Sequence, residues 1–253
     1  MTIRLLIANG CSFTWGDELD DRARAWPHVV GRALGAEVVN LGVCGGSNRR
    51  LVRTTVETLH RVVTDHRLMS TEVLFLGMWT SLERYEFFDP DTPDPVGRAD
   101  LLPGDEHWRR VLPWAARRRE RLARTYYREI HDDRGALNTF LVDWVLLQSF
   151  LSHGGYHFGF LASRPLFRDA PPPPAHLTDL IDPRYVHGGL TGLDGHSMST
   201  MTAHSHAYGP RRHPLTAAHE HFAGAIMPWL RSLQISNATH AETRSRPDLD
   251  AIR

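Results

Sequence analysis

Side chains able to take part in catalysis gather in three short loops and in front of one late helix. The loops span residues 10–17, 40–48 and 77–81, and between them they contain Ser, Cys, Asn, Thr and Asp among several glycines. Near the other end of the chain, His213 precedes a proline and an apolar helical pattern. Nucleophilic catalysis needs a hydroxyl or thiol, an imidazole to take its proton, and donors for the oxyanion. These segments together hold all of those groups.

The composition narrows the chemistry further. All 29 basic residues are arginine, so the chain has no lysine for a Schiff base, a phosphate loop or a general base. Histidine is abundant, with 16 copies, and imidazole is the natural acid–base group near neutral pH. The 29 acidic residues balance the arginines, which argues against general binding to nucleic acid or to an anionic membrane. We expect a small-molecule substrate and a cytoplasmic protein with no targeting segment.

Each of the three loops follows a predicted strand. Short apolar runs at residues 3–8, 37–41 and 71–76 predict buried strands, and helical patterns lie between them at residues 24–34 and 47–66. This alternation predicts a three-layer α/β/α fold with a doubly wound parallel sheet, of the flavodoxin-like kind. Such sheets bind ligands at the carboxyl ends of their strands, which is where the three loops lie.

The middle of the chain departs from this alternation. Residues 88–174 begin with a loop rich in Pro, Asp and Gly, and we expect them to form a mainly helical insertion or cap on a single domain of residues 1–233. We expect two insertion helices at residues 105–131 and 136–152, followed by a fourth strand at residues 156–162. A last helix packed on the sheet is expected at residues 214–233, and a polar tail at residues 234–253.

The spacing of the loop motifs resembles that of the SGNH (GDSL-type) hydrolase superfamily. That family has a Gly-Asp-Ser block with a glycine four residues after the serine, an Asn-x-x-x-x-Gly block after a strand, and a His-Pro pair at the start of the last helix. The corresponding residues here are Gly10-Cys11-Ser12 with Gly16, Asn40 through Gly45, and His213-Pro214. The resemblance covers the first third and the end of the chain, not the middle.

The resemblance implies a serine hydrolase or acyltransferase that uses no cofactor. Ser12 would attack an ester-linked acyl group of a small molecule or carbohydrate, and His213 would take the proton of the serine as general base. The backbone N–H groups of Ser12 and Gly45 would stabilise the oxyanion. An acyl-enzyme on Ser12 would then be resolved by water or by another alcohol.

The third block departs from the family pattern. Its asparagine would fall near Trp79, which cannot play the same role. We expect Asn48 to supply the missing oxyanion donor, with Thr80 as the other candidate, although Asn48 could equally be an ordinary N-terminal helix cap. Arg84, just beyond this block, could bind a carboxylate or phosphate of the substrate, or could pair with a neighbouring glutamate.

The last block lacks its usual acid. Pro210 stands three residues before His213, where the family carries aspartate. Another group must then orient the imidazole, and we expect this to be Asp194, Asp182 or a backbone carbonyl. Loss of the triad acid slows catalysis without abolishing it, because the oxyanion donors and substrate binding still contribute.

Each candidate also has an ordinary structural interpretation. Ser12 could be a turn residue or a helix cap, and Gly45 a turn glycine. Cys11 and Cys44 are expected to be small packing residues, with Cys11 as the alternative nucleophile. A non-catalytic binding protein on the same fold is therefore the first alternative function.

A cluster of histidines suggests a second alternative, a metallohydrolase. Its members are His187, His196, His204, His206, His213, His219 and His221. None of their spacings matches an established metal signature, and histidines two apart on a helix point to different faces. We therefore expect no metal. The sequence makes no prediction of the oligomeric state.

Overall fold

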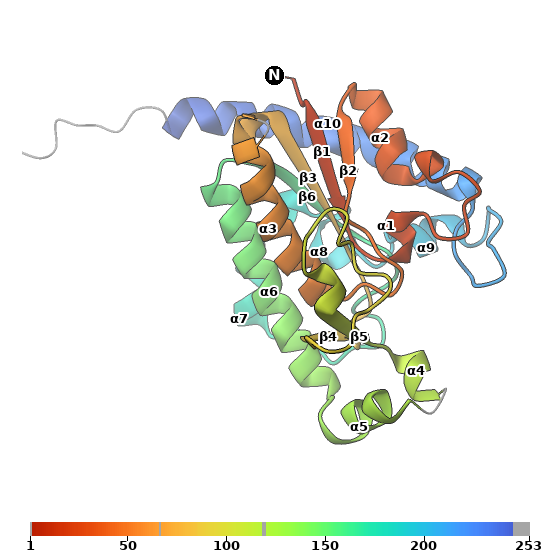
Figure 1. The fold of residues 1–253 in the computed structure, drawn as a ribbon. Coiled ribbons are helices and arrows are strands. Elements are labelled where there is room, and N and C mark those ends of the chain that lie inside the picture. The colour runs from red at the N-terminus through yellow and green to blue at the C-terminus, as the bar shows by residue number, and fades with distance from the viewer. Residues whose placement is uncertain (1, 66, 118–119, 245–253) are drawn as a thin grey trace, which may run out of the picture.

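A computed structural model describes residues 2–65, 67–117 and 120–244, and of residues 234–244 only the backbone (Figure 1). Its main sheet has four parallel strands in the order β2–β1–β3–β6. The strands are β1 (Leu5–Asn9), β2 (Glu37–Asn40), β3 (Val73–Trp79) and β6 (His157–Ala162). Val186 adds an isolated parallel bridge beyond β6. This strand order confirms the predicted doubly wound, flavodoxin-like α/β fold.

Helices cover both faces of this sheet (Figure 1). α2 (Trp26–Leu34) and α10 (Thr216–Arg244) pack on one face, and α3 (Asn48–Asp65) and α6 (Asp133–His153) pack on the other. All residues of β1 are buried. Because successive side chains of a strand point to opposite faces, both faces of β1 are therefore covered. That is why the strands are continuous apolar runs rather than alternating ones.

The middle segment begins with an antiparallel hairpin that the sequence did not predict. β4 (Tyr85–Phe88) pairs with β5 (Trp108–Val111), and α4 (Pro113–Arg117) and α5 (Arg121–Glu129) follow it. The expectation of one helix over residues 105–131 is therefore wrong.

The minor elements are α1 (Ser12–Trp15), η1 (Arg22–Arg24), η2 (Ser70–Glu72), η3 (Asp105–His107), α7 (Ala175–Thr178), η4 (Pro183–Tyr185), α8 (Gly189–Gly192) and α9 (Met198–Thr202).

A buried ion network ties this hairpin to α3. The carboxylate of Asp105 accepts hydrogen bonds from Arg50 at 2.6 Å and from Arg53 at 2.8 Å, and Arg53 also binds Glu86 of β4 at 3.1 Å. Burial acts to raise the pKa of Asp105, but the charge of Arg50 and the hydrogen bonds around the carboxylate outweigh it and lower the pKa. Asp105 is thus held as an anion by distant residues, which explains why a local helical pattern fails there.

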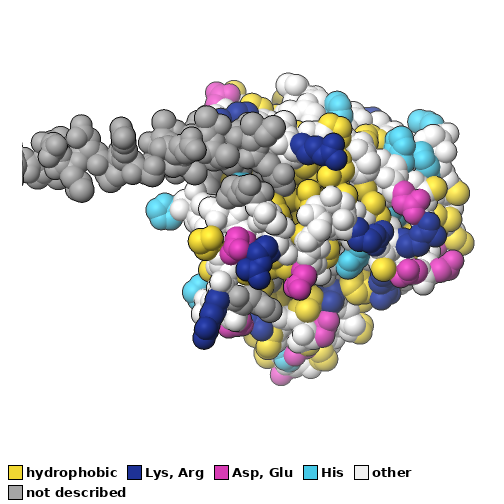
Figure 2. Space-filling model, turned by 90° about the horizontal axis from the view of Figure 1, so that it is seen from above, with side chains coloured by type: hydrophobic (Ala, Val, Ile, Leu, Met, Phe, Trp, Pro, Cys, Tyr) yellow, Lys and Arg dark blue, Asp and Glu magenta, His cyan; other side chains and the backbone are white. Residues whose placement is uncertain are grey.

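The surface is of mixed charge. On the face shown in Figure 2, arginine, acidic and histidine side chains are interspersed rather than separated into patches of one sign. None of the helices that the structure describes is long and apolar enough to cross a membrane. The last helix was expected to end at residue 233, but α10 continues to Arg244. The rest of the expected tail, residues 245–253, lies outside the described chain.

Candidate active site

Ser12 is the first residue of the short helix α1, directly after the turn that leaves β1 at the carboxyl end of the sheet. Asn9, the last residue of β1, fixes this turn by donating its side-chain amide to the hydroxyls of Thr54 and Thr55 on α3, at 2.8 and 3.0 Å. A Cβ atom at Gly10 would lie 2.4 Å from Thr14 Oγ1, so only glycine allows the chain to turn this tightly. Ser12 is 4% exposed, and its hydroxyl makes no hydrogen bond within the described part of the chain.

His213 lies beside the same turn. The edge of its ring meets Phe13 with the ring centres 6.0 Å apart. Its Nδ1 lies 2.8 Å from Glu18 Oε2, and its backbone N–H donates to the same oxygen at 3.2 Å. Because an ionised carboxylate only accepts hydrogen bonds, this contact places the proton of a neutral imidazole on Nδ1 and leaves Nε2 as an acceptor.

Glu18 is held in place by the segment that carries His213. Its carboxylate also accepts the Arg211 N–H at 3.0 Å. A Cβ atom at Gly209 would lie only 2.7 Å from this carboxylate, so glycine leaves room for it. Burial acts to raise the pKa of Glu18, but the hydrogen bonds from Arg211 and His213 outweigh it and hold the pKa below its usual value. Glu18 also has a φ of +67°, a costly conformation for a residue with a side chain. The fold thus keeps a carboxylate at the imidazole at the cost of local strain.

The acids that the sequence suggested for this role lie elsewhere, so that expectation is wrong. Asp194 accepts the backbone N–H groups of Leu166 and Phe167, at 2.5 and 3.1 Å. Asp182 caps η4 and pairs with Arg184. Both are engaged in structure away from the imidazole, and the carboxylate that contacts the imidazole is that of Glu18.

Gly45 lies in the loop after β2 with a φ of +74°. A Cβ atom there would lie 2.8 Å from Arg110 Nη1 and 3.1 Å from Leu112, both of the inserted segment, so this segment covers the loop. Arg110 also donates to the Cys44 carbonyl beside it. Within the described chain, neither the Gly45 N–H nor the Ser12 N–H donates a hydrogen bond, so both backbone donors are available.

Asn48 uses one of its two amide hydrogens within the fold, and the other donates to no acceptor in the described chain, so its role as an oxyanion donor stays a prediction. Its amide donates to the Thr80 carbonyl at 2.9 Å, and its side-chain oxygen accepts the Thr80 N–H at 2.8 Å. Asn48 therefore joins the loop after β2 to the loop after β3. The Thr80 hydroxyl is buried without a hydrogen-bond partner in the described residues, which leaves it as a side-chain donor near the turn.

Arg84 brings positive charge to this end of the sheet. It is buried, donates to the Gly46 carbonyl at 3.1 Å, and lies over the ring of Trp114. Burial acts to raise the pKa of the Cys11 thiol, but the charge of Arg84 and the nearby Thr80 side chain outweigh it and lower the pKa. The turn that carries Ser12 is thus in a field that favours negative charge.

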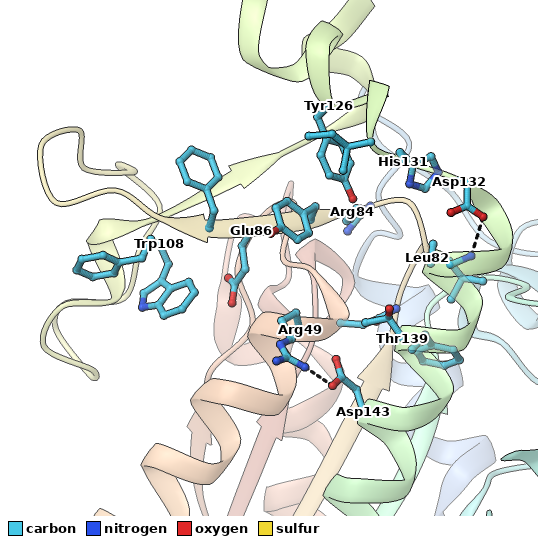
Figure 3. A pocket seen from close by; sticks show the side chains of 18 residues that line it. Arg49, Leu82, Arg84, Glu86, Trp108, Tyr126, His131, Asp132, Thr139 and Asp143 are labelled. Carbon is cyan, nitrogen blue, oxygen red and sulfur yellow. Dashed lines mark hydrogen bonds and ion pairs between the residues drawn. The ribbon is translucent and has the colours of Figure 1, made fainter. Parts of the chain in front are cut away.

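Two pockets adjoin this region. One, of about 690 Å³, is lined by Phe13, by three arginines, Arg164, Arg168 and Arg212, and by one acid, Asp169. None of these arginines forms an ion pair with an acid in the described chain. The other pocket, of about 630 Å³, lies between the hairpin, α5 and the α3–α6 pair (Figure 3). Its walls include Arg84, several aromatic rings and the ion pair of Arg49 with Asp143.

The histidine cluster is dispersed in the structure. His187 and His196 lie together, with ring centres 5.2 Å apart, and His206 and His221 form a separate pair at 4.7 Å. In the described part of the chain, the one group of three side chains that could hold a metal ion contains only His213 from this cluster. Its other members are Asp17 and Cys44.

Residues 15–243 match a protein family described as a family of unknown function, DUF6071. The chain belongs to this family. No curated protein matches it. The family description assigns no activity, so the function has to be inferred from the site.

Several solved structures are similar to the chain. One is a two-domain esterase active on acetylated mannans, at 13% identity and a TM-score of 0.43 over 97% of this chain and 52% of that one. The chain thus spans about half the length of that esterase. Another is a lipolytic G-D-S-L family member from Veillonella parvula DSM 2008, at 12% identity and a TM-score of 0.41 over 95% of this chain and 99% of that one. A third, from Desulfitobacterium hafniense DCB-2, is described as a putative lipolytic protein of the G-D-S-L family, at 14% identity and a TM-score of 0.33 over 89% of this chain and 98% of that one.

Glu18 is the residue of this site that the sequence reasoning missed. It lies six residues after Ser12, directly after Asp17, the last residue of the first of the three loops. Two carboxylates at the end of a nucleophile loop are the signal that could have found it. The family carries its acid just before the histidine in sequence, whereas Glu18 lies 195 residues before His213.

Proposed function

We propose that the chain is a serine esterase or acyltransferase of the SGNH type in which Glu18 replaces the usual triad aspartate. The observation that carries this proposal is the contact of Glu18 with His213 Nδ1 at 2.8 Å, beside the turn that bears Ser12. A carboxylate that fixes an imidazole next to a nucleophile turn is the arrangement required for general-base catalysis.

In the proposed reaction, Ser12 Oγ attacks the carbonyl carbon of an ester while its proton passes to His213 Nε2. The imidazolium that forms is stabilised by Glu18. The unpaired N–H groups of Ser12 and Gly45 stabilise the oxyanion. Collapse of the tetrahedral intermediate breaks the bond to the leaving alcohol, which takes the proton from Nε2. Water or a second alcohol then repeats these steps on the acyl-enzyme.

We further propose that the pocket beside Phe13 binds an anionic part of the substrate. Phe13 follows Ser12 directly, and Arg212 precedes His213, so the chain neighbours of both proposed catalytic residues line this pocket. Three arginines without acidic partners favour a carboxylate or phosphate, which guanidinium groups bind with paired hydrogen bonds.

The proposal is tested with a panel of short acyl esters, some neutral and some bearing a carboxylate or phosphate. Wild-type protein should hydrolyse at least one ester, and Ser12→Ala should remove this activity. Ser81→Ala is the matched control, because Ser81 is also buried at the end of a strand and is expected to be dispensable. Activity that persists in Ser12→Ala would contradict the mechanism, and tight binding of an intact ester without turnover would favour the non-catalytic alternative.

A further inference from the structure

We propose that Asp17, Cys44 and His213 form a binding site for a thiophilic divalent cation such as Zn²⁺, with a water molecule as the fourth ligand. Occupancy of this site would switch off the proposed triad, and only this consequence depends on the proposed function. The binding itself depends on the cluster of ligand atoms alone.

The spacing of the ligand atoms fits a tetrahedral centre. One atom from each of Asp17, Cys44 and His213 lies within 4.8 Å of the others. Asp17 Oδ2 is 3.4 Å from Cys44 Sγ and 3.6 Å from His213 Nδ1. Metal–ligand bonds of about 2.0–2.3 Å at tetrahedral angles put neighbouring ligand atoms roughly 3.3–3.7 Å apart. A cation could therefore enter with only small side-chain movements.

Glu18 adjoins this group of three and is not one of its ligands. Its Oε2 is 2.8 Å from His213 Nδ1, the nitrogen that also faces Asp17. These side chains come from three separate loops, and those of Asp17, Glu18 and His213 are each less than 15% exposed. The fold therefore already holds these side chains in place, and binding of a cation would require little further ordering of the chain.

The ligand set selects the kind of cation. A thiol with an imidazole and a carboxylate suits zinc, whereas magnesium and calcium take oxygen ligands. Because the thiolate, not the thiol, is the ligand, zinc binding at Cys44 should displace the thiol proton, and the affinity should increase with pH.

Coordination through Nδ1 would inactivate His213 as a base. A neutral imidazole carries one proton, so a cation on Nδ1 places that proton on Nε2. Nε2 then has no lone pair for the proton of Ser12. Glu18, when the site is empty, holds the opposite tautomer. The same side chains would thus support catalysis when empty and prevent it when occupied.

The test is a calorimetric titration of the full chain with Zn²⁺, and with Mg²⁺ as the second titrant. We expect one zinc site, with proton release seen as a dependence of the heat on the buffer, and no comparable binding of Mg²⁺. Cys44→Ala and Asp17→Asn should each weaken zinc binding by more than about tenfold. His221→Gln, which alters the separate pair of His206 with His221, is the control and should bind zinc as the wild type does.

If zinc does not bind, or if Cys44→Ala and Asp17→Asn bind it as tightly as the wild type, the site is wrong whether or not the chain is an esterase. If the chain hydrolyses esters, zinc should inhibit the wild type and a chelator should restore the rate. In Cys44→Ala the same fractional inhibition should need at least tenfold more zinc. Zinc binding without inhibition of an active enzyme would refute the switch but leave the esterase proposal standing.

Discussion

At the scale of single residues, the function proposed here depends on how Glu18 is held. Its carboxylate accepts hydrogen bonds from two backbone N–H groups and lies against the imidazole of His213. These bonds keep it ionised, as the lowered pKa of Glu18 indicates. An ionised carboxylate at Nδ1 both selects the useful tautomer and stabilises the imidazolium in the transition state.

We predict that Glu18→Gln lowers kcat by roughly 10²- to 10⁴-fold, as expected when the triad acid becomes neutral. Glutamine has the shape of glutamate but cannot stabilise the imidazolium. Asp182→Asn, which neutralises an acid away from the imidazole, should keep nearly the wild-type rate. Steady-state kinetics on the best ester decides this, and equal rates for Glu18→Gln and Asp182→Asn would exclude a triad role for Glu18.

The arginines beside Phe13 give a prediction about specificity. Arg168→Gln should lower kcat/KM for an anionic ester about tenfold, the usual effect of losing one charge-assisted hydrogen bond. It should change kcat/KM little for a neutral ester with the same acyl group. Arg134→Gln removes an exposed arginine of α6 and should affect neither ester. An equal loss on both esters would mean that Arg168 does not recognise charge.

At the scale of elements, the site depends on loops that are joined by a few buried polar contacts. Asn48 joins the loops after β2 and β3, and Asn9 joins the turn after β1 to α3. The hairpin that covers Gly45 is fixed through Asp105, whose carboxylate pairs with Arg50. Removing one partner of a buried ion pair leaves the other charge without compensation, which costs more than the pair itself contributes.

We therefore predict that Asp105→Asn destabilises the protein by about 3–5 kcal/mol. Asp100→Asn is the matched control. It breaks the ion pair of Arg98 with Asp100, whose side chain is 62% exposed, and exposed pairs contribute about 1 kcal/mol or less. Urea unfolding measures both changes. A loss below 1 kcal/mol for Asp105→Asn would show that the network does not hold the hairpin.

The sheet could be predicted from sequence because its signals are local. Apolar runs followed by glycine or asparagine mark strands, and their carboxyl ends meet at one edge. The hairpin could not be predicted, because β4 and β5 are separated by about twenty residues of loop and depend on arginines from α3. The position of Ser12 followed from local pattern, whereas the partner of His213 depends on contacts nearly two hundred residues apart in sequence.

At the scale of the whole molecule, two buried histidines make the fold sensitive to acid. His219 of α10 accepts the backbone N–H of Trp26 at 3.0 Å, which joins α10 to α2. His187 lies against Trp229 of the same helix. Burial lowers the pKa of each histidine from 6.5 to about 4. Both are therefore neutral in the folded protein at pH 7.

We predict that stability is lost as the pH falls from about 6.5 to 4. In this window the unfolded chain binds protons at His187 and His219 that the folded chain excludes, so protonation favours unfolding. Each histidine should remove about 3 kcal/mol by pH 4. His219→Asn, which keeps an acceptor for Trp26, should remove about half of the drop. His60→Asn, at an exposed site on α3, should retain all of it, and urea unfolding at several pH values tests this. A drop equally steep in His219→Asn would contradict the assignment.

The most direct test of the central claim, that Ser12 is a nucleophile activated by His213 and Glu18, is labelling with a fluorophosphonate followed by peptide mapping. This reagent captures activated serines irrespective of the natural substrate. The proposal predicts one adduct, on Ser12, with labelling much slower in Glu18→Gln and absent in Ser12→Ala. No adduct on the folded wild type, or an adduct on another residue that persists in Ser12→Ala, would contradict it.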